Sequence, residues 1–232
     1  MGNRSEVTFQ KGIFSFPSFL PQVLAAFSSR DFDAGRDSPF FLRSLGVDPA
    51  RFFTVRQVHE DRVILVTDPA AGEEADADAL LTEKRGITLL IRTADCVPVF
   101  FFDPVRPAVG LVHAGWQGAR KGIVRKMAEA FKQHFNSQPS KLRAALGPAI
   151  QKSCYEVGPE FFDYFPGFVE KTKEQNFFDL PAFVKQELID AGISESFITD
   201  SGLCTACSTD RFFSARREGQ STGRFLSAIM LK

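Results

Sequence analysis

Short apolar runs alternate with polar segments along most of the chain, a pattern typical of buried β-strands. The two most apolar runs, at 97–102 and 108–112, are neighbours in the sequence and rich in Val and Phe. The runs at 52–59 and 63–67 are separated by a short polar break, so we expect them to form a β-hairpin. Further strands are predicted at 23–28, 79–82, 88–92, 142–146, 197–199, 212–215 and 225–231.

Helical periodicity is clearest after Gly118, where Ile123, Met127 and Phe131 recur every four residues and Lys and Glu occupy the other face. This pattern predicts an amphipathic helix that packs on a sheet. A second helix should begin after Asp179 as N-cap and end at Gly192. Shorter helices are expected at 39–46 and 159–165, and loops at 31–37 and 68–78. Because no linker or internal repeat divides residues 1–232, we predict one α+β domain with mixed sheets.

Composition excludes several classes of protein. The 232 residues contain 28 basic and 28 acidic side chains, so no excess of positive charge favours nucleic acid or an anionic membrane. The apolar runs are shorter than the roughly 20 residues of a membrane-spanning helix. Residues 1–6 lack the apolar segment of a signal peptide, so a soluble cytoplasmic protein is expected. The sequence makes no prediction of oligomeric state.

The chain contains only three histidines, too few for a multicopper centre but enough for one mononuclear site. His59, Cys96 and His113 each stand at the edge of a predicted strand, with spacings unlike those of a zinc finger. Together they offer three ligands to Zn²⁺ and leave a fourth position open, which is the catalytic pattern. Two alternatives stay open, a set of ordinary buried side chains and a nucleophilic Cys96 activated by a histidine. We expect His134 to be a surface residue.

The remaining cysteines and charged residues are less specific. Cys204 and Cys207 form a C-x-x-C motif in a loop, which suggests redox chemistry, a second metal or an ordinary loop. Cys154 has no obvious partner and is interpreted as structural. Asp95 either orients a ligand or caps a turn. An arginine cluster near the C-terminus suits phosphate or carboxylate, or forms an exposed turn. Its members are Arg211, Arg216, Arg217 and Arg224.

Six motifs occur in an order that resembles one protein family. They are R-Q-V-H (56–59), A-D-A-L-L-T (77–82), T-A-D-C-V-P-V (93–99), H-A-G-W-Q-G (113–118), G-P-A-I with C-Y-E-V-G (147–158) and C-T with F-F-S-A-R-R and T-G-R (204–224). The chain is similar to the laccase-domain, or polyphenol oxidase-like, family, now described as zinc enzymes with purine nucleoside phosphorylase and adenosine deaminase activity. Bacterial peptidoglycan editing factor is a member. The resemblance implies that His59, Cys96 and His113 bind zinc, with copper as an alternative.

The resemblance also implies a fold and a reaction. The fold would be a sandwich of mixed sheets with flanking helices, similar to a Cys–His toxin deamidase domain. The activity would be phosphorolysis of purine nucleosides, including methylthioadenosine, together with adenosine deamination. Purine nucleosides and phosphate would then be the partners. Within the motifs we select Asp95 and Glu156 as proton carriers. Arg56, Arg211 and Arg217 are the candidates for binding phosphate.

Other functions remain possible at this point. One is an amide hydrolase that edits cell-wall precursors, with Cys96 as nucleophile or with a metal-activated water. Another is a binding module without catalysis. The older copper polyphenol oxidoreductase label fits poorly because there are only three histidines. Two departures from the family pattern bear on substrate range but not on the three metal ligands. Gln117 replaces the usual Arg, and segment 30–37 differs from the expected Gly-Gly-Val-Ser loop.

Overall fold

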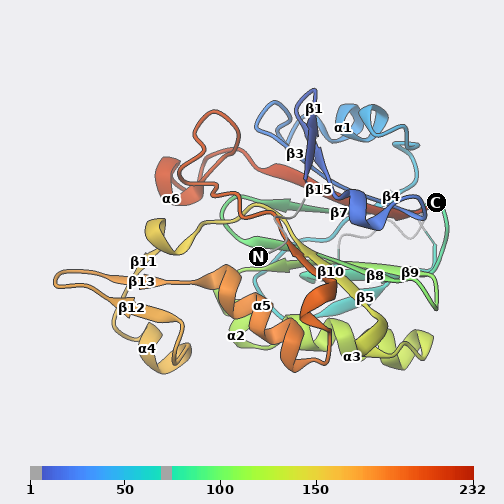
Figure 1. The fold of residues 1–232 in the computed structure, drawn as a ribbon. Coiled ribbons are helices and arrows are strands. Elements are labelled where there is room, and N and C mark those ends of the chain that lie inside the picture. Colours follow the sequence, from blue (N-terminus) through green and yellow to red (C-terminus); the bar gives the residue numbers. More distant parts are fainter. Residues whose placement is uncertain (1–6, 69–74) are drawn as a thin grey trace.

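Two mixed six-stranded β-sheets face one another in the computed structural model, which describes residues 7–68 and 75–232 (Figure 1). The first sheet has the order β1 (Thr8–Gln10), β2 (Ile13–Ser15), β3 (Val23–Ser28), β15 (Phe225–Leu231), β7 (Thr88–Thr93) and β4 (Phe52–Phe53). The second has the order β14 (Ile198–Asp200), β10 (Arg143–Leu146), β8 (Val97–Asp103), β9 (Ala108–Ala114), β6 (Ala79–Thr82) and β5 (Val63–Leu65). The predicted α+β sandwich with flanking helices is therefore confirmed.

Strand β8 shows why the central runs are apolar throughout. Phe100 and Phe102 belong to the core between the two sheets, where the ring centroids of Phe16 and Phe100 are 5.2 Å apart. Val99 and Phe101 belong to a second core, on the face covered by helices. Because both faces of β8 are buried, all of its residues except the terminal Asp103 are apolar.

Helices cover both outer faces of the sandwich (Figure 1). The long α3 (Ile123–Phe135) and α5 (Leu180–Asp190) pack on the second sheet, and α1 (Ser38–Ser44) packs on the first. A Cβ at Gly110 of β9 would lie 2.8 Å from the Phe131 ring, so glycine allows α3 to approach the sheet closely. The N-cap prediction is confirmed, because the Asp179 carboxylate accepts the backbone N–H of Ala182 at 3.0 Å.

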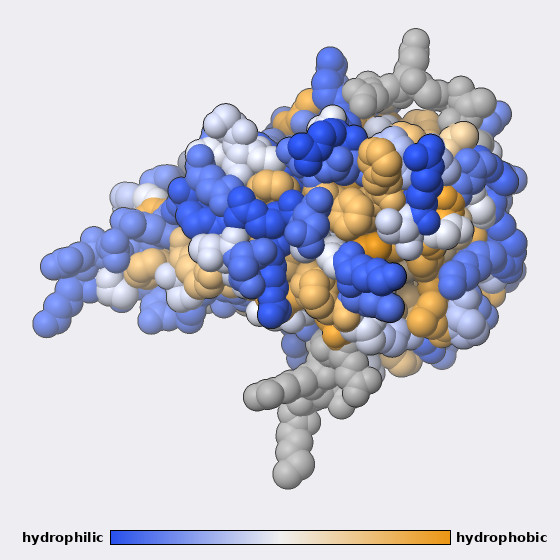
Figure 2. Space-filling model, turned by 90° about the horizontal axis from the view of Figure 1, so that it is seen from above, coloured by the Kyte–Doolittle hydropathy of each residue, from blue (hydrophilic) through white to orange (hydrophobic). Residues whose placement is uncertain are grey.

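A small third sheet projects from the body, at the left in Figure 1. It consists of β11 (Glu156–Val157), β13 (Asn176–Phe178) and β12 (Val169–Lys171), beside helix α4 (Phe161–Tyr164). Seen from above, the projecting part is mostly hydrophilic, and the apolar surface of the body is interrupted by hydrophilic side chains (Figure 2). The remaining short elements are α2 (Trp116–Arg120), α6 (Ala215–Glu218), η1 (Pro17–Phe19), η2 (Pro139–Lys141), η3 (Lys152–Cys154) and η4 (Glu195–Phe197).

Two predictions of strand pairing and extent are wrong. The segments 52–59 and 63–67 do not form a hairpin, because β4 pairs with β7 in the first sheet and β5 pairs with β6 in the second. Only Phe52–Phe53 of the first segment is a strand, and the chain then crosses between the sheets. The segment 212–215 is not a strand either, since Ser214 caps α6 by accepting the N–H of Arg217 at 3.2 Å.

One prediction falls partly outside the described residues, and another falls wholly outside them. The predicted loop at 68–78 includes 69–74, and the signal-peptide prediction concerned residues 1–6. Among the helices described, none has the length and apolar character needed to cross a membrane.

Packing between the sheets makes a testable prediction about stability. Phe100 has no exposed surface, so Phe100→Ala should reduce the free energy of unfolding by about 3–5 kcal/mol through lost burial and a cavity. Val105→Ala, at a side chain that is 62% exposed, is the matched control and should change it little. Urea unfolding of both variants measures the difference. Equal stabilities would contradict the placement of Phe100 in the inner core.

Candidate metal centre and pocket

The candidate site lies at the end of the sandwich where the chain passes between the two sheets. Segment 54–62 connects β4 to β5 and carries His59, and segment 94–96 connects β7 to β8 and carries Cys96. His113 is near the end of β9, whose antiparallel register pairs it with Pro98. This register also places Cys96 beside Gly115, so the hairpin of β8 and β9 brings two of the three candidates together.

A buried carboxylate, that of Asp78, fixes two of the three side chains. It has no exposed surface and accepts the backbone N–H groups of Val58, His59 and Glu60 at 3.2, 3.1 and 2.8 Å. Its Oδ1 also contacts His113 Nδ1 at 2.7 Å, which leaves Nε2 of His113 to face the site. His59 has a left-handed backbone with φ of 59°, which is costly for a residue with a Cβ. The bonds to Asp78 hold it in that conformation.

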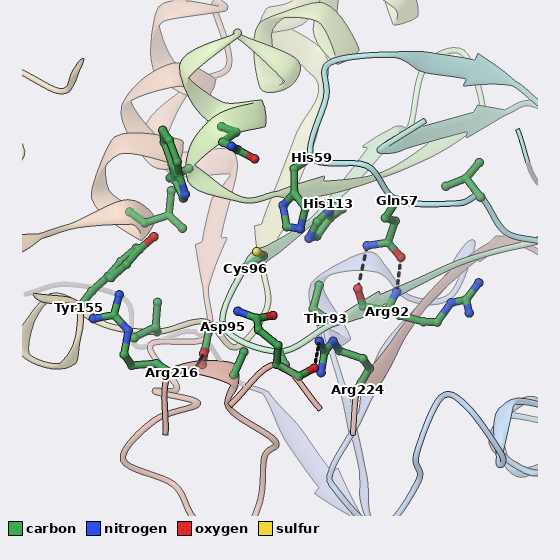
Figure 3. A pocket seen from close by; sticks show the side chains of 18 of the residues that line it. Gln57, His59, Arg92, Thr93, Asp95, Cys96, His113, Tyr155, Arg216 and Arg224 are labelled. Atoms are coloured by element: carbon green, nitrogen blue, oxygen red, sulfur yellow. Dashed lines mark hydrogen bonds between the residues drawn. The ribbon is translucent and has the colours of Figure 1, made fainter. Parts of the chain in front are cut away.

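The donor atoms of His59, Cys96 and His113 all lie within 4.8 Å of one another. Figure 3 shows the two imidazoles side by side with the sulfur of Cys96 next to them. A Cβ added at Gly115 would lie 2.9 Å from His59 Nδ1 and 3.0 Å from Cys96 Sγ, so only glycine leaves room for this cluster. The three side chains could hold a metal ion, as the sequence predicted for this set.

Charge pairing between Cys96 and His113 favours the thiolate form of the cysteine. Burial opposes ionisation of Cys96, but the positive charge of His113 and hydrogen bonds from both histidines outweigh it and lower the pKa of the thiol to about 6. Burial likewise disfavours the charged form of His113, but the Cys96 thiolate and Asp78 raise the pKa of the imidazole to about 9. Burial opposes ionisation of Asp78, but the hydrogen bonds from His113 and the backbone have the larger effect. The pKa of Asp78 is therefore lower than usual. A thiolate is the form in which cysteine binds metals.

The cluster opens into a pocket of about 720 Å³. Four arginines line this pocket. Among the described residues that line it, Asp95 is the only one with a carboxylate. The arginines are Arg56, Arg92, Arg216 and Arg224. Arg216 and Tyr155 lie on one side in Figure 3, and Arg92 and Arg224 on the other. The aromatic side chains of Trp116 and Tyr155 complete the wall. Burial, together with the negative charge of Cys96, raises the pKa of Tyr155, so its hydroxyl stays protonated.

Asp95 joins the site to the segment between β14 and β15. Its carboxylate accepts Thr205 Oγ1 at 2.6 Å, Ser214 Oγ at 3.1 Å and the backbone N–H of Arg216 at 2.7 Å. Like His59, it has a left-handed backbone, with φ of 87°. These bonds agree with the interpretation of Asp95 as a turn cap, and its side chain also lines the pocket beside Cys96. That Asp95 orients a metal ligand stays a prediction.

The predicted substrate-binding residues are only partly brought together. Arg56 lines the pocket and pairs with Asp76. Glu156 and Arg211 are exposed and outside the lining residues. The Glu156 carboxylate accepts Gln175 Nε2, and Arg211 lies 3.6 Å from an Asp210 oxygen. Arg217 turns away from the pocket and donates to the carbonyls of Thr205, Ala206 and Phe212.

Sequence reasoning missed several residues of the site. Asp78 lies inside the A-D-A-L-L-T motif and directly precedes a fully buried strand, a signal that a carboxylate there has partners inside the protein. Gln57 was also missed. It exchanges two hydrogen bonds with the backbone of Arg92, at 2.7 and 2.9 Å (Figure 3). Arg216 and Arg224 belong to the predicted arginine cluster but were not selected from it. His134 is exposed at the end of α3, as expected.

The fold and the site define a class of protein, an α/β/β/α sandwich with a His-Cys-His donor set opening into an arginine-lined pocket. A family model described as multi-copper polyphenol oxidoreductase laccase matches residues 36–232, and the chain belongs to this family. The description names several coppers, but the sequence has three histidines and His134 lies away from the other two. The residues present therefore suit one mononuclear site at this position.

Several relatives are named for reactions of nucleosides. The chain is 32% identical to purine nucleoside phosphorylase YlmD of Bacillus subtilis (strain 168), over 88% of this chain and 79% of that protein. It is 31% identical to adenosine deaminase RL5 from an unknown prokaryotic organism, over 81% and 78%. Among solved structures, the hypothetical protein YfiH of Bacillus licheniformis superposes with a TM-score of 0.90 at 30% identity, covering 97% of this chain and 99% of that one. YlmD of Geobacillus stearothermophilus also gives 0.90, at 26% identity over 97% and 98%.

The role of Asp78 can be tested by Asp78→Asn. The amide keeps the size of the side chain but turns one acceptor oxygen into a donor that faces other donors. We expect the free energy of unfolding to fall by about 2–4 kcal/mol, because several buried hydrogen bonds to a charge are lost. Asp76→Asn, two residues away with a side chain that is 45% exposed, is the control and should have little effect. Denaturant unfolding at neutral pH compares them, and equal losses would show that Asp78 does not organise the site.

Proposed function

We propose that this protein is a purine nucleoside phosphorylase that also deaminates adenosine, with Zn²⁺ bound by His59, Cys96 and His113. The observation that carries the proposal is a soft three-donor set at the base of a pocket lined by four arginines. The names of relatives at 31–32% identity support the two reactions. We also propose a cytoplasmic location, because all four cysteines are free thiols, which are typical of a reducing compartment.

The chemistry of the donors fits zinc. One thiolate and two imidazoles suit Zn²⁺ or copper and are poor ligands for Mg²⁺ or Ca²⁺, which prefer oxygen. The hydrogen bond from His113 to Asp78 is the outer contact typical of zinc-bound histidines and would fix the ring with Nε2 toward the metal. A bound Zn²⁺ would supply Lewis acidity at the base of the pocket. Elemental analysis distinguishes zinc from copper.

The arginines would bind the second substrate, phosphate. In phosphorolysis, a phosphate oxygen forms a bond to C1′ of the ribose, the bond from C1′ to the purine nitrogen breaks, and its electron pair leaves with the base, which takes up a proton. Phosphate must therefore be held close to the ribose with its charge neutralised. Arg216 and Arg224 line the pocket from opposite sides, and Arg56 also faces it. Trp116 and Tyr155 add aromatic surface to the pocket wall, which a purine would contact.

Deamination would need a group that carries protons, since an oxygen from water replaces the C6 amino group, which leaves as ammonia. Asp95 is the lining carboxylate available for this task, whereas Glu156 lies outside the pocket. The three bonds that Asp95 accepts also give it a positioning role, because they hold the segment that carries Arg216. Methylthioadenosine remains a substrate to test under the same proposal.

Product analysis tests the function directly. Zinc-loaded protein incubated with inosine and phosphate should release hypoxanthine and ribose 1-phosphate in equal amounts, and no base when phosphate is omitted. Chelation of the metal should abolish turnover, and zinc should restore it. Hydrolysis of an amide with Cys96 as nucleophile, the alternative from the sequence, would need no metal. Absence of nucleoside turnover by the metal-loaded protein would refute the proposal.

Gly115→Ala tests whether the cluster is the metal site. The new Cβ would press against both His59 Nδ1 and Cys96 Sγ, so zinc affinity and phosphorolysis should both fall, by about 10-fold or more, while the fold persists. Gly35→Ala is the matched control, because its Cβ would meet only Asp33 Oδ1 at 3.7 Å. Zinc competition with a chromogenic chelator and steady-state rates provide the two measurements. Unchanged zinc affinity in Gly115→Ala would place the metal elsewhere.

Arg216→Gln tests the phosphate site. Loss of a charge that faces the pocket should raise the KM for phosphate by about 10-fold or more, with a smaller effect on the KM for inosine. Arg211→Gln removes an arginine of the same cluster outside the pocket and should leave both constants unchanged. Steady-state kinetics at varied phosphate and fixed inosine gives the comparison. If only the KM for inosine rises, Arg216 contacts the nucleoside and not phosphate.

A further inference from the structure

The other three cysteines also converge, although they come from segments about 50 residues apart in the sequence. The sulfur atoms of Cys154, Cys204 and Cys207 all lie within 4.8 Å of one another, and those of Cys154 and Cys207 are 2.9 Å apart. This corrects the interpretation of Cys154 as a residue without a partner. None of the three lines the pocket. They form a thiol cluster separate from the His59 site, which we call the tri-cysteine cluster.

Backbone hydrogen bonds hold the segments around the cluster together. Residues of the two segments exchange hydrogen bonds, from Ala149 N to Leu203 O and from Thr205 N to Ala149 O, both at 3.1 Å. The N–H of Cys207 points to Cys204 Sγ at 3.4 Å, a contact that stabilises a thiolate. Cys154 and Cys204 are half-buried, and Cys207 is exposed, so an ion can enter from solvent.

Charged neighbours hold the loop between Cys204 and Cys207. The Arg217 guanidinium donates to both intervening carbonyls, those of Thr205 and Ala206, at 2.8 and 2.7 Å. Thr205 Oγ1 donates to Asp95. A positive charge therefore lies against a loop that presents sulfur ligands, where it would offset the negative charge of several thiolates. The sequence prediction that Arg217 binds phosphate is replaced by this role in the loop.

We propose that the tri-cysteine cluster is a second metal site, which takes a soft cation such as Zn²⁺ or Cu⁺ through three thiolates. Soft sulfur ligands select these ions, and three protein ligands leave a position for an external fourth ligand. On binding, each thiol gives its proton to solvent and donates a sulfur lone pair to the ion, with no change in oxidation state.

The site would join two parts of the pocket wall. Cys154 directly precedes Tyr155, and Cys204 directly precedes Thr205, which is bonded to Asp95 beside Cys96. A shared ion would fix the segment 151–157 to the loop 203–208 and thereby set the position of this wall. A disulfide between Cys154 and Cys207 is the rival explanation for their proximity, and it would leave Cys204 without a role.

Cobalt titration in a Cys96→Ser background isolates the tri-cysteine cluster, because the other thiolate site is then removed. Reduced, metal-free Cys96→Ser protein should bind one Co²⁺ per chain with strong sulfur-to-cobalt charge-transfer absorption, which Zn²⁺ displaces. Adding Cys207→Ser should weaken cobalt binding by roughly 100-fold. Adding Ser208→Ala, in the same loop, should leave it unchanged. Absence of the charge-transfer band in the Cys96→Ser protein would overturn the proposal.

Two further measurements cover the case in which Cys96→Ser fails to fold. The wild-type protein should carry two zinc ions per chain. The single variant Cys207→Ser should carry one. Zinc should also raise the unfolding temperature of the wild type more than that of Cys207→Ser, since a ligand that binds the folded state stabilises it. One zinc in both proteins would contradict the second site. A Cys154–Cys207 disulfide that mass spectrometry detects in protein kept in reducing buffer would also contradict the second site.

Discussion

The bond network of the buried Asp78 carboxylate is the interaction on which the site depends. One side chain without exposed surface accepts three successive backbone N–H groups from the segment that carries His59 and also orients the ring of His113. The segment has no strand partners of its own at these positions, so its conformation rests on these bonds. The bond from its N–H to Asp78 stabilises the left-handed backbone of His59. A single buried charge thus couples two candidate ligands to β6 and β9.

Asp95 performs the corresponding task on the other side of Cys96. It fixes Thr205, Ser214 and the backbone of Arg216, and in this way joins the crossover from β7 to β8 with the segment that leads into β15. Three crossovers between the sheets therefore meet at one end of the sandwich. Asp95 joins two of them, and Asp78 holds the third against β6 and β9. The same contacts relate the two proposed metal sites, because Thr205 lies between the tri-cysteine cluster and Asp95. Chemistry is concentrated where the chain changes sheets, since side chains there can face a pocket without disturbing either core.

Much of the fold was predictable because burial leaves a strong pattern. The runs of β8 and β9, the stripe of α3 and the cap at Asp179 were all identified from local residues. The register of β8 and β9 also accounts for the meeting of Cys96 and His113. The hairpin prediction for 52–59 and 63–67 was wrong. A short polar segment has the same sequence pattern whether the chain turns back on itself or crosses to another sheet. Asp78 and Arg216 could not be assigned from spacing, since their roles depend on contacts between segments far apart in the sequence.

Anomalous X-ray diffraction at the zinc absorption edge, on crystals of the zinc-loaded protein, tests the central claim most directly. The account predicts a strong anomalous peak at about 2.0–2.3 Å from a nitrogen of His59, the sulfur of Cys96 and Nε2 of His113, with Nδ1 of His113 still bonded to Asp78. A crystal in which these three side chains bind no zinc, while zinc occupies other residues of the chain, would contradict it.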